Sequence, residues 1–270
     1  MAHKVMLLGQ IEAKTVPLLN LNGEAVGEVV LPPIFNYPLR KDLIRRAFHA
    51  AHTASLQPKG RDPLAGKRRV GESWGLGHSV ARVPRLDNGR AVFAPMVRGG
   101  RLAHPPKVEK VIKELINKKE RVRALISAIA ATADITLVKA RGHLFTASQL
   151  PIVVVDDLVN VGKASEAKEV LKKLGVWDDV VRAAERTRIR AGKGKMRGRK
   201  YVTPKSVLIV THEDLPNAYK AFRNLPGVDV VPVRLLSVIH LAPGGWPGRL
   251  TIYTKSAVEA LKERFEVVRG

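Results

Sequence analysis

The sequence predicts an α/β protein with an open, mostly parallel sheet flanked by helices and with one long extended basic loop. In the half that follows residue 150, short apolar runs alternate with patterns of helical period, as expected when helices connect parallel strands. Before that half lies a segment rich in glycine and proline that follows no regular period. The formal net charge of +23 exceeds what solubility requires and indicates a polyanionic partner, with nucleic acid as the default.

The half after residue 150 contains the elements of the predicted parallel sheet. Buried strands are expected at residues 152–155, 207–210, 228–231 and 250–253. Helices are expected at residues 163–174, 176–184, 234–240 and 255–265, and in a segment that starts near Asp214 and Pro216. In that last segment Leu215, Tyr219 and Phe222 are expected to face inward. Continuous apolar strands are buried on both faces, so helices should cover both sides of the sheet.

The N-terminal part predicts a strand, a hairpin and two helices. The strand covers residues 4–8, and the hairpin joins residues 18–21 to 25–31 through Asn22-Gly23, a pair that favours two-residue turns. Pro38 opens the first helix. The second helix, over residues 108–129, is the clearest pattern in the chain because apolar side chains keep helical spacing for more than five turns. The apolar face of the first helix is expected to contain Leu43, Ile44, Ala47, Phe48 and Ala51.

Between these two helices, residues 56–105 predict a long loop that depends on a partner. The segment holds ten Lys or Arg against three acids, and its glycines and prolines stop helices and strands from propagating. Ordering it would cost on the order of 50 to 100 kcal/mol, which its few apolar residues cannot offset by packing on themselves. Doubled back, the loop could reach up to about 80 Å. We therefore expect a globular α/β domain of residues 1–55 with 106–270, and an extended loop that is disordered alone and ordered in RNA.

The loop carries the first set of candidate RNA-binding residues. Trp74, His78 and Phe93 stand alone among glycines and arginines, which suits stacking on unpaired bases, although a small local hydrophobic cluster is the alternative. The basic candidates for phosphate contact are Lys59, Arg61, Lys67, Arg68, Arg69, Arg82, Arg85, Arg90, Arg98 and Arg101.

A second basic segment covers residues 186–201 and holds eight bases and no acid. Glycines at positions 192, 194 and 198 allow backbone amides to approach phosphate closely. It is not a nucleotide-binding phosphate loop, because Gly192-Lys193-Gly194-Lys195 has neither the spacing of glycine, four residues and glycine-lysine nor the Ser or Thr hydroxyl that follows. A solvated charge run is the alternative, but such runs usually contain acids. The candidates here are Arg190, Lys193, Lys195, Arg197, Arg199 and Lys200.

No catalytic, metal or cofactor site is predicted. The chain has no cysteine, and its eight histidines are scattered. Asp156-Asp157 follows the first buried strand and is expected to form a turn and a helix entry rather than an active site. No apolar run is long enough to span a membrane, and no signal peptide is recognisable, so a soluble protein inside the cell is expected.

Three long strings in this chain resemble a known family. They are GESWGLGHSVARVPR (71–85), FAPMVRGGRLAHPPK (93–107) and RAGKGKMRGRKY (190–201), and they resemble the universal large-subunit ribosomal protein four in its archaeal and eukaryotic form. The short connection between Arg85 and Phe93 and the absence of a charged extension look archaeal.

The resemblance implies a non-catalytic, early-binding assembly protein of the cytoplasmic ribosome. The globular domain would lie on the outer side of the large subunit, and the loop would run through ribosomal RNA to the wall of the peptide exit tunnel. Its tip, around residues 67–78, would lie beside the tunnel protein of the universal family twenty-two and near the nascent chain.

Two other classes of function stay open from the residues alone. An RNA-modifying enzyme would need a cofactor loop after the first parallel strand, which residues 156–162 (DDLVNVG) do not supply convincingly. A stand-alone regulatory RNA-binding or DNA-binding protein would share the charge.

Overall fold

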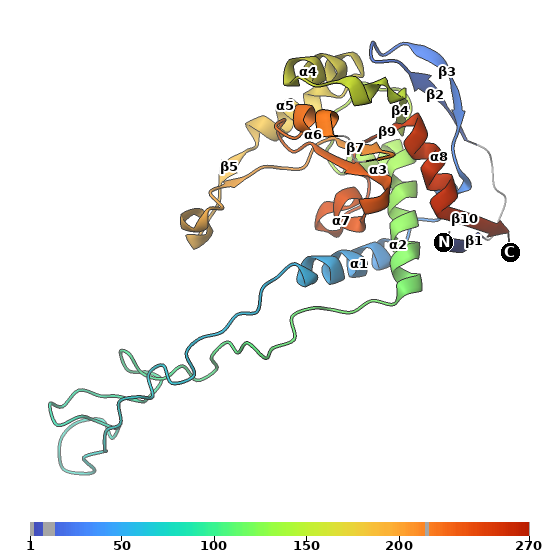
Figure 1. The fold of residues 1–270 in the computed structure, drawn as a ribbon. Helices are drawn as coiled ribbons and strands as arrows, with labels where there is room; N and C mark the ends of the chain where they lie inside the picture. The colour runs from blue at the N-terminus through green and yellow to red at the C-terminus, as the bar shows by residue number, and fades with distance from the viewer. Residues whose placement is uncertain (1–2, 8–13, 214–215, 270) are drawn as a thin grey trace. The chain divides into compact units, whose positions relative to one another are not determined.

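The computed structural model describes residues 3–7, 14–213 and 216–269. The chain divides into two compact units, one formed by residues 1–52 and 115–270 and the other by residues 53–114 (Figure 1). The first unit contains the regular secondary structure that was expected in the second half of the sequence.

The centre of the first unit is a six-stranded sheet with the order β3-β2-β4-β9-β7-β8. Every neighbouring pair is parallel except β2 and β3. All residues of β4, β7 and β9 are buried, because the sheet is covered on both faces. The predicted α/β class with a mostly parallel sheet is therefore confirmed. The strands are β2 (Thr15–Leu19), β3 (Ala25–Val30), β4 (Ile152–Val154), β7 (Leu208–Thr211), β8 (Asp229–Pro232) and β9 (Thr251–Thr254).

Successive strand residues point into two separate hydrophobic cores. Val153, Leu208, Val210 and Tyr253 belong to one core, whereas Ile152, Val154, Ile209 and Ile252 on the same strands belong to the other. On the first side lie α1 (Lys41–Ala54), α2 (Lys118–Ala130), α7 (Val238–Leu241) and α8 (Lys255–Arg264) (Figure 1). On the second side lie α3 (Ile135–Ala140), α4 (Ala164–Lys173), α5 (Trp177–Glu185) and α6 (Pro216–Phe222).

Short elements complete the first unit. The 3-10 helices are η1 (Pro33–Asn36), η2 (Ala131–Ala133), η3 (Asp156–Asn160), η4 (Lys193–Arg197), η5 (Val233–Leu235) and η6 (Pro243–Gly245). A two-stranded parallel sheet pairs β1 (His3–Leu7) with β10 (Phe265–Arg269). The sequence analysis missed β10, because Phe265 extends the apolar spacing of the preceding helix. The predicted first strand ended at Leu8, which lies outside the described residues.

The predicted two-residue turn of the N-terminal hairpin is wrong, although the hairpin itself forms. Five residues, 20–24, connect β2 to β3. The Asn20 side-chain oxygen accepts hydrogen bonds from the backbone N–H groups of Asn22 and Glu24, both at 2.9 Å. Gly23 has φ 85°, and a Cβ there would lie 2.5 Å from the carbonyl oxygen of Lys173. The turn is thus decided by a side-chain hydrogen bond and a contact with α4.

Helix α2 begins at Lys118, ten residues later than predicted. Every residue from Ala124 to Ala130 is buried, whereas Val111 and Leu115 are 85% and 82% exposed. A helix in water is held mainly by packing of its apolar face, and residues 108–115 do not bury theirs. Apolar spacing alone therefore overestimated the length of this helix.

Two further expectations are corrected in the C-terminal half. Tyr219 is 46% exposed rather than inward, while Phe222 on the same helix is fully buried; Leu215 lies outside the described residues. The helix expected over residues 234–240 is divided into η5 and α7, joined at Leu236 in extended conformation.

Arg249 is the largest fully buried side chain of the described residues. It forms an ion pair with Asp229 at 2.7 Å and donates hydrogen bonds to the carbonyl oxygens of Ser206 (2.8 Å), His240 (2.8 Å) and Gly227 (3.1 Å). Burial lowers the pKa of this guanidinium, and the Asp229 carboxylate opposes that change. Arg249 itself lies just before β9. Its side chain therefore connects the residues that precede β7 and β8 to helix α7.

A second buried polar cluster surrounds Asp179 in the first turn of α5. Its carboxylate accepts hydrogen bonds from His143 Nδ1 (2.9 Å), Leu144 N (3.0 Å) and Arg182 Nε (2.8 Å). Burial raises the pKa of Asp179, but the hydrogen bonds from His143 and Arg182 outweigh it and hold that pKa below its ordinary value. Burial also lowers the pKa of His143, so the imidazole is neutral and its Nδ1–H donates to the carboxylate.

The Asp179→Asn variant is expected to lower the free energy of unfolding at pH 7 by about 1–3 kcal/mol. Because the folded-state pKa of Asp179 lies below its unfolded value, its stabilisation is complete above the unfolded pKa and is lost as pH falls through the folded pKa. Urea unfolding from pH 7 down to pH 3 should therefore show a shallower acid decline in the variant. Asp178→Asn, at the exposed neighbouring position, is the control. An acid decline as steep as in the parent protein would contradict the assignment.

Candidate nucleic-acid interface

Residues 186–201 form a short antiparallel hairpin with a 3-10 helix between its strands. Strands β5 (Arg188–Ile189) and β6 (Tyr201–Val202) pair through Arg188 with Val202 and Ile189 with Tyr201, and η4 lies between them. The backbone of Arg190 donates to the carbonyl oxygen of Lys200 at 2.7 Å, and its Nε donates to that of Arg199 at 2.9 Å. Gly192 and Gly198 have φ values of 75° and 71°, which side-chain-bearing residues rarely adopt. The glycines therefore allow this tight hairpin, which we call the basic hairpin.

The bases of the basic hairpin are exposed and lack carboxylate partners. All eight face solvent, and none forms an ion pair with any residue that the structure describes. Lys200 Nζ lies 5.4 Å from the centre of the Tyr201 ring, which is itself 60% exposed. The predicted residues that come together here are Arg190, Lys193, Lys195, Arg197, Arg199 and Lys200. Their charges are available to an external anion.

The second unit, residues 53–114, is built from turns and isolated bridges. Glu72 and Arg85 exchange two backbone hydrogen bonds of 3.1 and 2.9 Å, and the N–H of Val92 donates to Pro84 at 2.8 Å. Val92 and Ala94 are buried, at 6% and 8% exposure. The expectation that this segment cannot pack on itself is wrong in this respect, because local hydrogen bonds and a small apolar centre hold its turns.

Two glycines of the second unit, Gly66 and Gly100, lie so close to other backbone segments that a side chain would not fit. A Cβ on Gly100 would lie 1.9 Å from the carbonyl oxygen of Ala94, and a Cβ on Gly66 would lie 2.4 Å from that of Gly100. Three segments of the unit therefore meet where no side chain would fit.

The aromatic residues of the second unit contact neighbouring cations and each other. The Trp74 and His78 rings lie 5.7 Å apart, and the guanidinium of Arg85 lies 6.0 Å from the centre of the Trp74 ring. Arg101 lies 5.5 Å from the Phe93 ring. Trp74 and Phe93 nevertheless keep 39% and 38% exposure. Their stacking on RNA bases stays a prediction, and the contacts within the unit match the alternative of a local cluster.

The basic candidates of the second unit differ in burial and in their bonds to other residues of the unit. Arg85 is half-buried and donates to the carbonyl oxygens of Gly89 (2.8 Å) and Ala81 (3.3 Å). Arg68 pairs with Asp62, whose pKa the Arg68 hydrogen bond holds below its ordinary value. The remaining eight form no ion pair with a described residue. Arg101 is half-buried, and the exposed ones are Lys59, Arg61, Lys67, Arg69, Arg82, Arg90 and Arg98.

A cationic groove of about 830 Å³ in the second unit was missed by the sequence analysis. Four lysines, Lys59, Lys107, Lys110 and Lys113, line it together with His104 and one acid, Glu114. Lys110 and Lys113 fall within residues 108–129, for which the sequence predicted one long helix. The apolar spacing of these residues fits a helix, so the sequence could not show that they lie in turns and not in α2.

The structure also places the residues that had been considered for other chemistry. Asp156 accepts hydrogen bonds from the backbone N–H (3.1 Å) and the hydroxyl (2.6 Å) of Ser256, and with Asp157 it opens η3. The Asp pair is thus a turn and helix entry, as expected. Among the described residues, no three His, Asp or Glu side chains are grouped to hold a metal ion. Within the same residues, no helix is both long and apolar enough to cross a membrane.

These features define a class: an α/β protein with an exposed basic hairpin that contains no acid. Comparison with known proteins narrows this class. Residues 29–264 match the model of the ribosomal protein L4/L1 family. The chain is 55% identical over 269 residues to the large ribosomal subunit protein uL4 of Aeropyrum pernix, with 99% of each chain covered. The protein of the same name from Methanocaldococcus jannaschii is 56% identical over 247 residues, which cover 92% of this chain and 98% of the relative.

The chain therefore belongs to the ribosomal protein L4/L1 family. Members of this family are structural components of the ribosome and not enzymes. The resemblance carried by residues 71–85, 93–107 and 190–201 is thereby confirmed.

Proposed function

We propose that this protein is a structural constituent of the large ribosomal subunit that binds large-subunit ribosomal RNA and assists early assembly. The observation that carries the proposal is the basic hairpin, with eight exposed bases and no acid. Phosphate binding to such a surface is favourable because released counterions gain entropy. The relatives named large ribosomal subunit protein uL4, which match nearly the whole chain, support the same location.

We propose further that residues 56–105 form the part of the protein that enters ribosomal RNA and reaches the wall of the peptide exit tunnel. The exposed bases and partly exposed rings of this segment suit phosphate contact and stacking on unpaired bases. The neighbours in this arrangement would be the tunnel protein of the universal family twenty-two and the nascent chain near residues 67–78. Family membership supports this proposal, as does the number of exposed bases.

The native protein is expected to co-sediment with large subunits through a high-salt sucrose gradient of cell extract. An integral subunit protein is held by many contacts, of which only the exposed ionic ones are screened by salt. Immunodetection across the gradient at about 0.1 and 0.5 M salt would measure this, with a loosely bound translation factor as the control that salt removes. If the protein stayed at the top of the gradient at both salt concentrations, the ribosomal proposal would fail and a free regulatory RNA-binding protein would take its place.

A further inference from the structure

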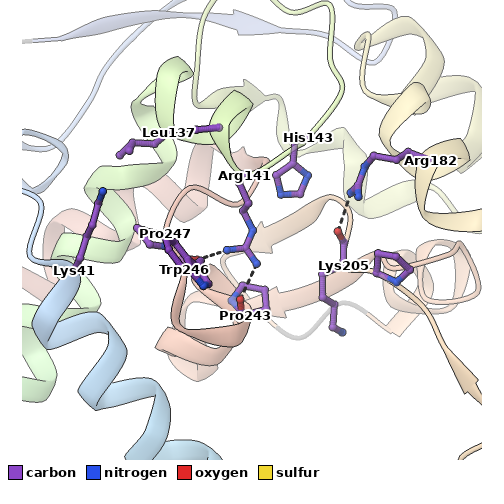
Figure 2. A pocket seen from close by; sticks show the side chains of 11 residues that line it. Lys41, Leu137, Arg141, His143, Arg182, Lys205, Pro243, Trp246 and Pro247 are labelled. Atoms are coloured by element: carbon purple, nitrogen blue, oxygen red, sulfur yellow. Dashed lines mark hydrogen bonds between the residues drawn. The ribbon is translucent and has the colours of Figure 1, made fainter. Parts of the chain in front are cut away.

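The first unit contains a pocket of about 650 Å³ that is separate from the basic hairpin (Figure 2). Small-molecule sites typically measure about 300–1,000 Å³. The pocket draws side chains from five parts of the fold, namely the start of α1, helix α3 with the residues just after it, helix α5, the segment between β6 and β7, and the segment from η6 to Pro247. Its polar and aromatic lining consists of Lys41, Arg141, His143, Arg182, Lys205 and Trp246.

The indole of Trp246 supplies an exposed flat surface in this pocket. It is 69% exposed, although it follows directly after the buried Gly245 and precedes the buried Pro247. Arg141 donates hydrogen bonds to the carbonyl oxygens of Trp246 and of Pro243, the latter at 2.7 Å (Figure 2). The guanidinium thus holds the segment that carries the indole. The indole is therefore an exposed flat π surface on a segment whose position is fixed, an arrangement that suits stacking with a planar ligand.

The lining of the pocket is cationic and contains no acid. Lys205 pairs at 2.9 Å with Asp229, a carboxylate that it shares with Arg249, and Arg182 pairs with Asp179 at 2.8 Å. Neither Lys41 nor Arg141 forms an ion pair with any residue in the described part of the chain. Burial lowers the pKa of Arg141 to about 10, so this guanidinium still carries its charge at neutral pH. The pocket therefore has two uncompensated positive charges.

His143 adds a buried hydrogen-bond acceptor to the wall. Its side chain is only 2% exposed, and Asp179 holds its Nδ1–H. With the imidazole neutral, Nε2 carries a lone pair, and this buried atom has no hydrogen-bond partner among the described residues. An unpaired buried acceptor is costly, and a ligand with an O–H or N–H donor would satisfy it.

We propose that this pocket binds one unpaired nucleotide of RNA, an inference that rests on the RNA-binding role proposed above. The base stacks on the Trp246 indole, the phosphate lies toward Lys41 and Arg141, and a hydroxyl or amino group donates to His143 Nε2. An acidic peptide would satisfy the two cations but would leave the indole face and the neutral acceptor unused. A nucleotide matches all three features of the pocket. Its base offers a flat π face to the indole, its phosphate an anion to the two cations, and its O–H or N–H groups donors to His143 Nε2.

Fluorescence of Trp246 tests this proposal directly. The chain has three tryptophans, so the Trp74→Phe/Trp177→Phe variant leaves Trp246 as the only indole. We expect saturable quenching by a single-stranded hexauridylate and weaker quenching by uridine monophosphate. Inorganic phosphate and a hexaglutamate peptide at the same ionic strength should give none. In this background Lys41→Gln should raise the half-saturating RNA concentration about threefold or more, whereas Lys172→Gln, at an exposed position on α4, should leave it unchanged.

A second measurement uses crosslinking and separates this proposal from the RNA-binding role itself. In the full chain, Trp246→Ala should lower ultraviolet crosslinking of thiouridine-labelled hexamer to peptides containing Arg141 or Lys205 by roughly 5- to 150-fold, the loss expected when one stacked base is released. Trp246→Phe should restore part of it. Crosslinking to the basic hairpin should not change. Quenching by phosphate or hexaglutamate equal to that by RNA would overturn the nucleotide assignment. If the hexamer crosslinked only to the hairpin and left Trp246 emission unchanged, the pocket proposal would fail while the RNA-binding role would stand.

Discussion

Replacing Lys193, Lys195, Arg197 and Arg199 with alanine is expected to weaken binding to a large-subunit RNA transcript by up to about a thousandfold at 0.1 M salt. Each phosphate contact contributes about 0.7 to 0.9 to the slope of log K against log salt, so four lost contacts flatten that slope by up to about 2.8 to 3.6 units. The hairpin should survive, because its stabilising hydrogen bonds at positions 194, 199 and 200 use backbone oxygens that alanine retains. Fluorescence anisotropy at several salt concentrations would measure both quantities.

The matched control for this variant removes the same net charge from helices. Lys163, Lys172, Lys220 and Lys262 are exposed and lie on or next to α4, α6 and α8. Their replacement by alanine should change the salt slope by less than about one unit, if RNA contacts these helices rarely. Equal flattening by the two quadruple variants would show that only net charge matters. An unchanged slope in the hairpin variant would show that residues 186–201 are merely a solvated surface.

The Arg249→Met variant is expected to lower the free energy of unfolding by about 3–5 kcal/mol. Methionine fills much of the same volume, but it leaves the Asp229 carboxylate without its partner at 2.7 Å and removes the donors to Ser206, His240 and Gly227. Leaving buried acceptors unsatisfied costs free energy well beyond the net value of the hydrogen bonds themselves. Urea unfolding at pH 7 would measure the change. Arg234→Met, at an exposed position on η5, should change stability by no more than about 0.5 kcal/mol.

A double-mutant cycle would show whether the ion pair itself matters. Asp229 also pairs with Lys205, so Asp229→Asn should cost less than Arg249→Met. The Asp229→Asn/Arg249→Met double variant should be less destabilised than the sum of the two single variants, because each single change already breaks the same contact. Strict additivity would mean that Arg249 acts through the backbone carbonyls alone.

Composition and local patterns predicted the parallel sheet and the basic segment of residues 186–201. The buried strands were visible because strands covered on both faces are continuously apolar, as in Leu208–Thr211. The basic segment of residues 186–201 was recognised because eight bases without an acid cannot be part of a core, whereas its hairpin was not predicted. Both signals lie within short windows of sequence, so they do not require knowledge of distant contacts.

Several features depended on contacts between residues far apart in the chain. The strand order β3-β2-β4-β9-β7-β8 inserts the last strand of the sheet, β9, between β4 and β7. Helix α2 begins at Lys118 because its apolar spacing becomes effective only where a core exists to cover it. Strand β10 could not be distinguished from the end of α8, since Phe265 is buried in either conformation.

By itself, the sequence determined the α/β class, the location of the basic segments and membership of a ribosomal protein family, because these follow from local composition and from long matching strings. Only the tertiary structure decided which polar residues share a site. Arg249 and Asp229 are 20 residues apart in the chain, and the Trp246 pocket gathers residues from position 41 to position 247. Such groupings arise when the sheet brings strand ends together, and burial then makes each unpaired charge or acceptor costly. Because of this cost, the unpaired Nε2 of His143 supports the proposed ligand, and the Arg249–Asp229 ion pair matters for stability.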